Sequence, residues 1–436
     1  MKILRFAALF CAFSSPALAA VDIQTVTSPG GIQAWLIEDH NIPFMSLEIE
    51  FRGGTSLDQP GKRGAVNLMT ALIEEGTGDL DSQGFAKARD SLAASYQFDS
   101  GVDTVSVSAQ FLTENRDQAV DLLRQALTAP RFDQEAIDRV RGQVLANIRS
   151  DAKDPSSIAG RALKEMSYGD HPYATSGDGT EDSVNALTRD DIVAAHQAAL
   201  ARDRIYVAAS GDITAEELGP ILDKLLGGLP EKGAPLPERA PQNLKPGVTV
   251  IDFPGPQSTV LFSQSGIRSN DPDYFAAVLL NEVLGGGRFS ARLMTEVREK
   301  RGLTYGIGTY LVAYDQAESI MGQFSAANAN VAQAIDVIRS EWARIATEGV
   351  SEQELADAKT YATGSYPLRF EGNARIASIL VGMQMIGLPA DYPATRNDRV
   401  NAVTMDDIKR VAARLFKSDE LHFVVVGQPD GLQTSP

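Results

Sequence analysis

The sequence predicts an α+β fold in which one domain occurs twice in tandem, each copy a mostly antiparallel sheet with helices packed on one face. The first observation is an internal repeat. Residues 184–192 read VNALTRDDI and residues 400–408 read VNAVTMDDI, at an offset of 216 residues (400 minus 184). The second is that the match continues without a gap into an apolar strand ending in Gly211 in one copy and Gly427 in the other. Such self-similarity indicates one domain encoded twice.

A segment rich in proline and glycine separates the two copies. Residues 227–241 read GGLPEKGAPLPERAP, without hydrophobic periodicity, which is typical of an extended surface linker. We therefore predict a first domain over residues 20–227, a linker over residues 228–246 and a second domain over residues 247–436.

The N-terminus has the pattern of a secretory signal peptide. Lys2 and Arg5 flank the start of a short apolar run, and residues 17–19 read ALA, an A-x-A cleavage motif. The run is too short to span a bilayer, which takes about 20 residues. We expect residues 1–19 to be removed after Ala19, leaving a periplasmic protein without a membrane span.

Cleavage would leave an acidic chain without cysteine. The only cysteine, Cys11, lies in the signal, so thiol and disulfide chemistry are excluded for the mature protein. The signal also carries two of the 40 basic residues and none of the 57 acidic ones, so its removal changes the formal charge from −17 to −19. A strongly acidic surface argues against nucleic acid and anionic membranes as partners and is compatible with peptide substrates.

Hydrophobic periodicity predicts the elements of the first copy in order. Residues 44–52 alternate as a strand, residues 64–73 and 84–94 form helices, and residues 97–111 contain a strand with strict alternation at 102–108. Amphipathic helices follow at 116–127 and 134–152. The second copy repeats the plan, with strands near Thr249 and Thr259 and helices over 273–284 and 292–298.

Several motifs resemble peptidase family M16, the group of pitrilysin, insulinase and the mitochondrial processing peptidase. Residues 52–58 (RGGTSLD) resemble the family's first strand and turn, and residues 64–77 resemble its helix with a terminal Gly-Thr. Residues 169–173 (GDHPY) resemble its His-Pro-Tyr loop, and residues 285–293 and 297–305 resemble its second-half motif. The resemblance covers essentially the whole mature chain. It implies two homologous domains that form half of a clamshell, and zinc proteolysis for the family as a whole.

The zinc motif of active family members is missing. Those members carry His-x-x-Glu-His on the first-half helix, where two histidines one turn apart bind zinc and the glutamate is the general base. The corresponding positions are Asn67, Thr70 and Ala71, which cannot take those roles. The stretch that would supply a third, glutamate ligand, residues 143–149, contains no acid. We predict no metal and no cofactor in this chain, with zinc expected on a partner chain.

The histidines do not offer a substitute pair on a helix. No two of the four lie within one helical turn of each other, and each is better interpreted as a residue with a local structural role: His40, His171, His196 and His422.

The second-half motif is intact. Arg298 and Tyr305 have the spacing of a family pair that, by the resemblance, reaches across the clamshell to substrate near the zinc. A guanidinium suits a carbonyl, oxyanion or carboxylate, and a phenol can donate to developing negative charge. Without the resemblance, a surface ion pair for Arg298 and a core position for Tyr305 would be the better interpretation. With it, we favour a role in substrate binding.

Two further motifs are less specific. Val105 and Val107 lie on the alternating strand, which resembles the family strand whose edge pairs with substrate, and an ordinary sheet strand is the alternative. The segment Gly285–Gly287 lacks the Lys-Ser/Thr of a phosphate loop, so we interpret it as a turn at a helix end.

Two functions from different classes follow. In the first, the chain is the non-catalytic subunit of an exported two-chain peptidase. A zinc-bearing sister supplies the metal, and this chain supplies Arg298, Tyr305 and half of the chamber in which peptides are cleaved. In the second, it is a degenerate relative that binds or scaffolds without proteolysis. The intact pair Arg298 and Tyr305 favours the first.

Overall fold

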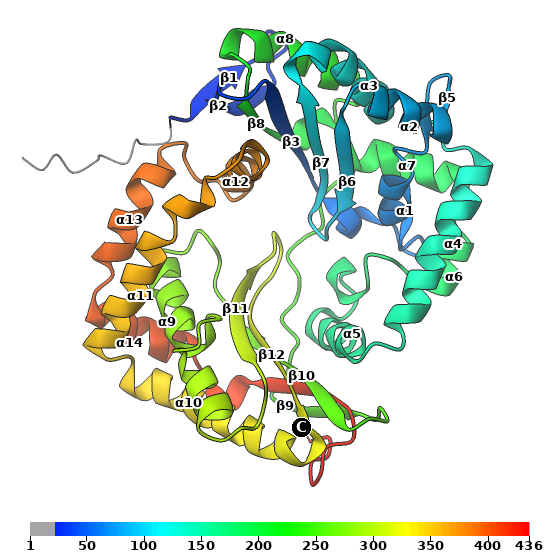
Figure 1. Ribbon diagram of the computed structural model, residues 1–436. Coiled ribbons are helices and arrows are strands. Elements are labelled where there is room, and N and C mark those ends of the chain that lie inside the picture. The colour runs from blue at the N-terminus through cyan, green and yellow to red at the C-terminus, as the bar shows by residue number, and fades with distance from the viewer. Residues whose placement is uncertain (1–21, 436) are drawn as a thin grey trace, which may run out of the picture.

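A computed structural model describes residues 22–435, and the predicted signal peptide, residues 1–19, lies outside that range. The first half of the chain builds a six-stranded sheet and the second half a five-stranded one (Figure 1). The prediction of two homologous domains in tandem is confirmed. No helix within residues 22–435 combines the length and the apolar character needed to cross a bilayer.

The first sheet has the strand order β1-β2-β8-β3-β7-β6, and all its neighbours are antiparallel except β2 and β8. Its strands are β1 (Gln24–Thr27), β2 (Gln33–Glu38), β3 (Phe44–Arg52), β6 (Ser95–Ser100), β7 (Thr104–Leu112) and β8 (Ile205–Gly211). A short two-stranded sheet joins β4 (Gly76–Thr77) to β5 (Leu80–Asp81).

The second sheet has the strand order β11-β12-β10-β13-β9, with β13 and β9 as its one parallel pair. Its strands are β9 (Gly247–Ile251), β10 (Gln257–Ser265), β11 (Ile307–Ala313), β12 (Glu318–Ala327) and β13 (His422–Val426). Read from the other edge, this is the order of the first sheet without β1, so the repeat seen in the sequence is a repeat of topology.

The helices follow the same repeat. The first half contains α1 (Ala65–Ala71), α2 (Ser82–Ser91), α3 (Arg116–Thr128), α4 (Gln134–Asp151), α5 (Pro155–Tyr168), α6 (Glu181–Asn185), α7 (Arg189–Ala199) and α8 (Ala215–Leu226). The second half contains α9 (Tyr274–Gly285), α10 (Val331–Glu348), α11 (Glu352–Gly364), α12 (Asn373–Met385), α13 (Tyr392–Ala402) and α14 (Met405–Leu415).

The repeated sequence forms the same helix start in both halves. Thr188 caps α7 and Thr404 caps α14, each accepting a hydrogen bond from the backbone N–H of an aspartate three residues later. The two aspartates, Asp191 and Asp407, bond back to the threonine N–H at 2.8 Å and 3.0 Å. These reciprocal bonds satisfy N–H groups that the first turn of a helix leaves free.

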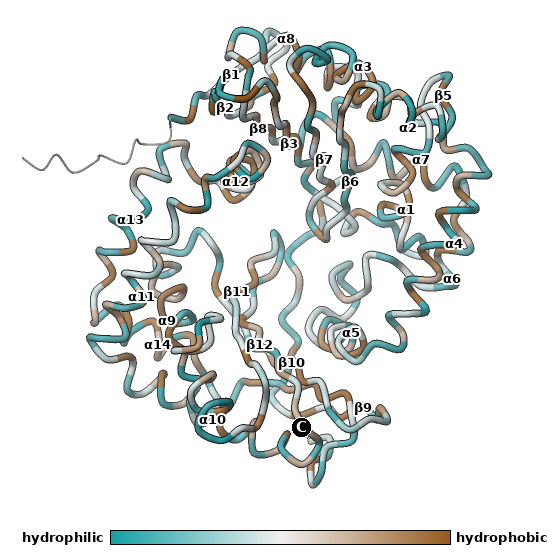
Figure 2. The backbone as a smooth tube through the Cα atoms, viewed as in Figure 1, coloured by the Kyte–Doolittle hydropathy of each residue, from teal (hydrophilic) through white to brown (hydrophobic). Residues whose placement is uncertain are grey.

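Each half buries its own core between one sheet face and its helices. Alternation along β3 places Leu47, Ile49 and Phe51 in the first core with no exposed surface. In the second core, Phe262 of β10 packs against Trp342 of α10. Hydrophobic residues recur along the strands and along the helices that cover them (Figure 2).

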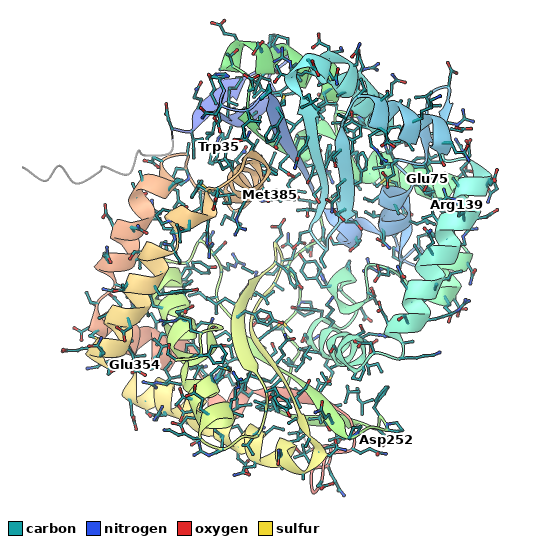
Figure 3. The ribbon with its side chains drawn as sticks, viewed as in Figure 1. Trp35, Glu75, Arg139, Asp252, Glu354 and Met385 are labelled. Carbon is teal, nitrogen blue, oxygen red and sulfur yellow. The ribbon has the colours of Figure 1, made fainter. Side chains whose placement is uncertain are left out.

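The two halves exchange one helix each, which the sequence analysis did not predict. Helix α5 of the first half packs on the second sheet, where Ala159 and Leu163 contact a cluster that includes Leu261 and Val424. Helix α12 of the second half packs on the first sheet, where Ala377 and Leu380 meet Ala208. Figure 3 shows Trp35 of β2 and Met385 of α12 near this second junction. The exchange covers part of the sheet face that each domain's own helices leave open.

The connection between the halves is extended. It runs from the end of α8 to the start of β9 without helix or strand and is largely hydrophilic (Figure 2). Backbone hydrogen bonds fix it to both halves, from Ala234 N–H to Ala198 O at 3.0 Å and from Ala240 N–H to Gln316 O at 2.9 Å. Its path is therefore set by contacts along its length.

Candidate functional site

The first candidate region is α1, where active family members would carry the zinc motif. The helix begins after its N-cap residue, Gly64, which has a φ of 91°. The Asp58 carboxylate accepts hydrogen bonds from the N–H groups of Gly64 and Val66, both at 2.8 Å. Burial raises the pKa of Asp58 to about 6, although these two donors and Arg63 favour its charged form.

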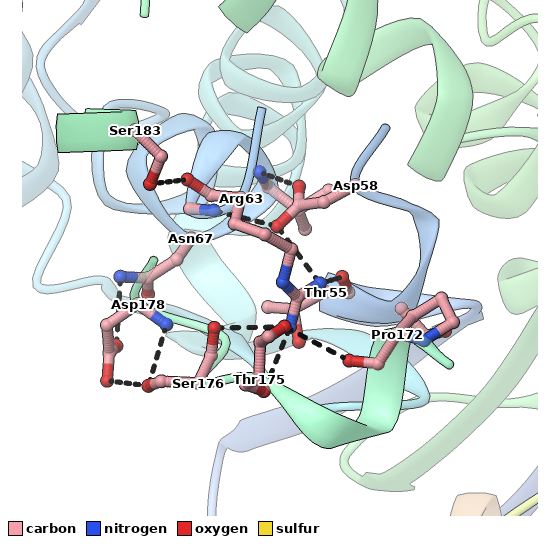
Figure 4. Close-up of polar contacts among 12 residues, drawn as sticks. Thr55, Asp58, Arg63, Asn67, Pro172, Thr175, Ser176, Asp178 and Ser183 are labelled. Atoms are coloured by element: carbon pink, nitrogen blue, oxygen red, sulfur yellow. Dashed lines mark hydrogen bonds and ion pairs between the residues drawn. The ribbon is translucent and has the colours of Figure 1, made fainter. Parts of the chain in front are cut away.

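Arg63 ties this helix start to a distant loop. Its guanidinium lies 3.4 Å from the Asp58 carboxylate and donates to the carbonyl oxygens of Thr175 and Ser176, both at 3.1 Å, and of Thr55 (Figure 4). The Asp58 side chain has no exposed surface. A buried charge pair of this kind holds the surrounding backbone in one arrangement, because breaking it would leave a charge without a partner.

Asn67 is engaged by neighbours within the chain. Its amide nitrogen donates to Asp178 Oδ1 at 3.1 Å, and its amide oxygen accepts from the Ser100 hydroxyl at 3.1 Å. Asp178 also accepts from the Ser176 hydroxyl at 3.1 Å (Figure 4). A polar network therefore occupies the position where a first zinc ligand would lie.

The other two positions of the motif are equally unsuited to zinc. Thr70 is 2% exposed and donates its hydroxyl to Val66 O at 2.8 Å, so its side chain faces its own helix. Ala71 is exposed and has no ligand atom. On α4, the stretch 143–149 contains no acid and places Val144 and Leu145 in the core. The donor set that a catalytic zinc requires is absent from these two helices.

Each of the four histidines contacts a polar group elsewhere in the fold. His40 lies 2.7 Å from Asp212 and 3.2 Å from Glu38, and His171 contacts Glu238 O at 2.9 Å. His196 contacts Leu127 O at 2.8 Å, and His422 contacts Lys245 O at 2.7 Å. Across residues 22–435 no three His, Cys, Asp or Glu side chains gather as a metal site would require.

The second candidate region holds Arg298 and Tyr305. Arg298 lies on a π-helical turn, Met294–Glu299, whose apolar residues Met294 and Val297 are buried in the second core. The turn ends where Gly302 N–H donates to Arg298 O at 2.9 Å. Arg298 lies 4.7 Å above the ring of Phe289, measured from its central carbon to the ring centroid. Tyr305 is 86% exposed, so the core position that was its alternative does not hold.

Tyr305 borders an open cleft of about 750 Å³. Its other walls include the end of α9 at Gly285–Gly287 and the first residues of β11. Gly287 has a φ of 80°, a conformation that favours glycine, and the chain reverses there directly after α9. The prediction that this glycine run forms a turn at a helix end is therefore confirmed.

The structure does not bring the two candidate regions into one site. The residues that anchor α1, such as Val66 and Leu68, belong to the first core, and those that anchor Arg298 belong to the second. Each region presents its own side chains from its own half.

The prediction for Val105 and Val107 is wrong. Strand β7 lies between β3 and β6 and is hydrogen-bonded on both sides, so it has no free edge. Both side chains are fully buried in the first core. Their alternation reflects core packing on one face of the sheet, and the edge strands of this sheet are β1 and β6.

Sequence patterns did not identify Asp178 and Phe289. Asp178 contacts Asn67 from 111 residues away, a proximity that no local pattern reveals. Phe289 lies two residues after Gly287, and no local pattern indicates that Arg298 stacks on its ring.

Comparisons with known proteins agree with the arrangement described. The family described as Insulinase (Peptidase family M16) matches residues 34–181, and the Peptidase M16 inactive domain matches residues 186–361. The chain is 25% identical to the Non-peptidase homolog YmxG of Helicobacter pylori over 390 residues, covering 89% of this chain and 90% of that one. It is 22% identical to the mitochondrial-processing peptidase subunit beta of Saccharomyces cerevisiae over 391 residues, covering 86% of this chain and 84% of that one.

Two solved structures share the fold. A peptidase M16 inactive domain from Pseudomonas fluorescens has a TM-score of 0.88 at 28% identity, covering 94% of this chain and 99% of that one. A protease from Helicobacter pylori has a TM-score of 0.84 at 16% identity, covering 94% of this chain and 100% of that one.

Proposed function

This chain belongs to peptidase family M16 as an inactive member that holds no catalytic zinc, and we propose that it is the non-catalytic subunit of a two-chain zinc peptidase. A sister chain would hold the metal. This chain would contribute Arg298, Tyr305 and half of the chamber to a composite site for peptide cleavage. We further propose that the assembly works in the periplasm, after cleavage of this chain behind Ala19.

One observation carries this proposal. The first half has replaced the metal site with internal hydrogen bonds, whereas the second half keeps Arg298 without a carboxylate partner in residues 22–435 and keeps Tyr305 86% exposed. An exposed phenol and an unpaired guanidinium add little to the stability of a single chain. Both groups suit the carbonyl or developing oxyanion of a peptide held by another subunit.

The chemistry available to this chain is binding and polarisation. A guanidinium is permanently charged and offers a planar fork of N–H donors, which fits a carbonyl, oxyanion or carboxylate. The Tyr305 hydroxyl can donate a hydrogen bond to the same group. Zinc on the sister chain would supply the activated water, because no general base stands at position 70.

A binding or scaffold role without proteolysis is the alternative. The description of the Helicobacter pylori relative as a non-peptidase homolog is the observation in its favour. It predicts that nothing is gained in peptide cleavage when this chain meets a zinc-bearing relative.

Co-expression with a zinc-bearing M16 chain from the same genome tests the proposal. We expect the two chains to co-purify as one particle with the mass of a heterodimer and one zinc per pair. Separate elution at micromolar concentration, with cleavage unchanged by mixing, would favour the scaffold role. N-terminal sequencing of the native protein tests the location, since a mature chain that still begins at Met1 in the cytosol would contradict export.

A further inference from the structure

Arg298 differs from every other basic residue in its segment. Five lie between residues 288 and 301, and four of them meet a carboxylate. Those four pairs are Arg288 with Glu282 at 2.6 Å, Arg292 with Glu354 at 2.7 Å, and Lys300 and Arg301 with Glu296 at 2.6 Å and 2.7 Å. No carboxylate within residues 22–435 lies within ion-pairing distance of Arg298. Because the chain has a net charge of −17, a shortage of acidic residues does not explain why Arg298 lacks a carboxylate partner.

Two arginines in the segment stack on aromatic rings, and only one of them is neutralised. Arg288 lies 4.8 Å above the ring of Tyr361 and is also paired with Glu282. Arg298 lies 4.7 Å above the ring of Phe289 and has only the ring. The face of an aromatic ring attracts a guanidinium and leaves the N–H groups at its rim free. Phe289 therefore orients Arg298 without using its hydrogen-bond donors.

Core packing does not explain the position of Phe289. It is 64% exposed and belongs to no buried cluster, although large apolar side chains are usually covered. It follows the turn at Gly287, which borders the same cleft as Tyr305. An apolar ring, a free guanidinium and a phenol thus occur together around the turn that closes α9.

We infer that Phe289 and Arg298 form a subsite for a peptide carboxylate that stands beside an apolar side chain. The inference rests on the proposed function for taking a peptide as the ligand, and it names the class of peptide. The free N–H fork of Arg298 accepts the two oxygens of a carboxylate in parallel hydrogen bonds. The exposed part of the Phe289 ring covers the neighbouring apolar side chain. Phe289 then has two roles: it positions Arg298, and it determines specificity through its contact with the apolar side chain.

The acidic character of the chain makes this subsite selective. A net charge of −17 opposes the approach of acidic peptides, so binding of one depends on a local cation that is not already neutralised. Among the five basic residues of the segment, only Arg298 meets that condition. An amide in place of the carboxylate loses the charge-assisted pair and should bind more weakly.

Peptide binding to the isolated mature chain tests the inference without the sister subunit. We would use a fluorescein-labelled hexapeptide with an amidated C-terminus and one glutamate next to a leucine, and a counterpart with glutamine in place of glutamate, and measure fluorescence anisotropy at low salt. We expect the glutamate peptide to bind about tenfold or more tightly than the glutamine peptide. Arg298→Met should abolish that preference. Arg288→Met is the matched control, because it removes a stacked but neutralised arginine, and should retain the preference.

Two substitutions at Phe289 distinguish the contribution of its aromatic ring from that of its apolar bulk. Phe289→Leu keeps an apolar side chain but loses the ring face, and should weaken glutamate-peptide binding about two- to fivefold, which corresponds to roughly 0.5–1 kcal/mol. Phe289→Trp keeps a ring and should restore binding. Equal affinity of the wild-type chain for the two peptides would overturn the inference. So would an unchanged preference in Arg298→Met. Neither result would affect the proposed function, which is judged by whether cleavage depends on mixing the two chains.

Discussion

The first-half helix α1 and the second-half turn that carries Arg298 make opposite use of polar side chains. Around α1, Asn67 is hydrogen-bonded to Asp178 and Ser100, and Arg63 pairs with Asp58, whose side chain has no exposed surface. Around Arg298, a half-buried guanidinium lies against the Phe289 ring without a carboxylate partner in residues 22–435, and the Tyr305 phenol is 86% exposed. Both regions come from the same repeated fold, so the difference lies in their residues.

At the position where active family members would carry the zinc motif, hydrogen bonds within the chain engage Asn67. That region therefore has a structural role in this chain. Arg298 and Tyr305 have no such internal pairing within residues 22–435. Under the proposed function, both groups are available to a peptide held by a second chain.

The largest effect on stability is expected from a substitution of Arg63, in the internally hydrogen-bonded region around α1. Arg63→Met should lower the free energy of unfolding by about 3–5 kcal/mol, because it leaves Asp58 buried without its charge partner and frees three carbonyl oxygens. Urea unfolding followed by circular dichroism measures it. Lys62→Met is the control, since Lys62 pairs with Asp191 at the surface and should cost about 1 kcal/mol or less. Equal losses of unfolding free energy in the two variants would mean that the buried Arg63–Asp58 pair contributes no more than a surface pair.

Substitutions of Arg298 or Tyr305 should lower catalytic activity and leave stability nearly unchanged. Arg298→Ala or Tyr305→Phe, mixed with an unaltered zinc-bearing sister, should lower kcat about a hundred- to a thousandfold, if the group stabilises the oxyanion. A rise in KM alone would mean that it binds the ground state. The unfolding free energy of each variant should stay within about 0.5 kcal/mol of wild type. Full activity in both variants within an intact complex would make these residues structural.

A third prediction concerns a carboxylate buried on the first sheet. Glu48 of β3 is 8% exposed and accepts a hydrogen bond from the Ser108 hydroxyl at 2.7 Å. Burial raises the pKa of Glu48 to about 7, and the nearby Glu50 and Asp99 add to the rise. The folded chain therefore binds a proton between pH 7 and about pH 4.5 that the unfolded chain does not. Through this group, stability increases as the pH falls across that window.

Glu48→Gln should remove this dependence and keep an oxygen for Ser108. The variant should be more stable than wild type at pH 8, by up to about 3 kcal/mol, with the difference shrinking towards pH 5. Urea midpoints at four pH values between 5 and 8 measure it, with the exposed Glu114→Gln as the control. If the urea midpoints of wild type and Glu48→Gln change in parallel with pH, Glu48 is ionised in the folded chain like any surface carboxylate.

The smallest effect is expected from restoring histidines to α1. Asn67→His with Ala71→His should still leave the chain without stoichiometric zinc at micromolar metal, because residues 143–149 offer no third ligand and Asp178 is already engaged. Metal analysis after dialysis measures it. One tightly held zinc per chain would show that the site had lost its ligands and little else.

Much of this contrast could be predicted from the sequence. The internal repeat and the hydrophobic alternation predicted two tandem α+β domains, because both patterns are local. The loss of zinc at Asn67, Thr70 and Ala71 could be inferred because ligand chemistry depends on residue type. The exposure of Tyr305 followed only from the family resemblance, since its local pattern favoured the core.

The remaining features depend on contacts between distant segments. Alternation at Val105 and Val107 gives the buried face of a strand but not whether its edge is free, and β7 is internal. The sequences of α5 and α12 do not say which sheet each helix covers, and both cover the sheet of the other half. The stacking of Arg298 on Phe289 joins the π-helical turn to the segment after Gly287, a contact that no local pattern indicates.

The most direct test of the composite site is a titration of activity. Increasing amounts of this chain are added to a fixed amount of the zinc-bearing sister, and the initial rate of peptide cleavage is measured. The composite site predicts a negligible rate for the sister alone, a linear rise, and a plateau at one chain per sister. Arg298→Ala should reach its plateau at the same ratio of one chain per sister, but with a much lower rate of cleavage. A rate that is already full without this chain, and flat on its addition, would contradict the composite site.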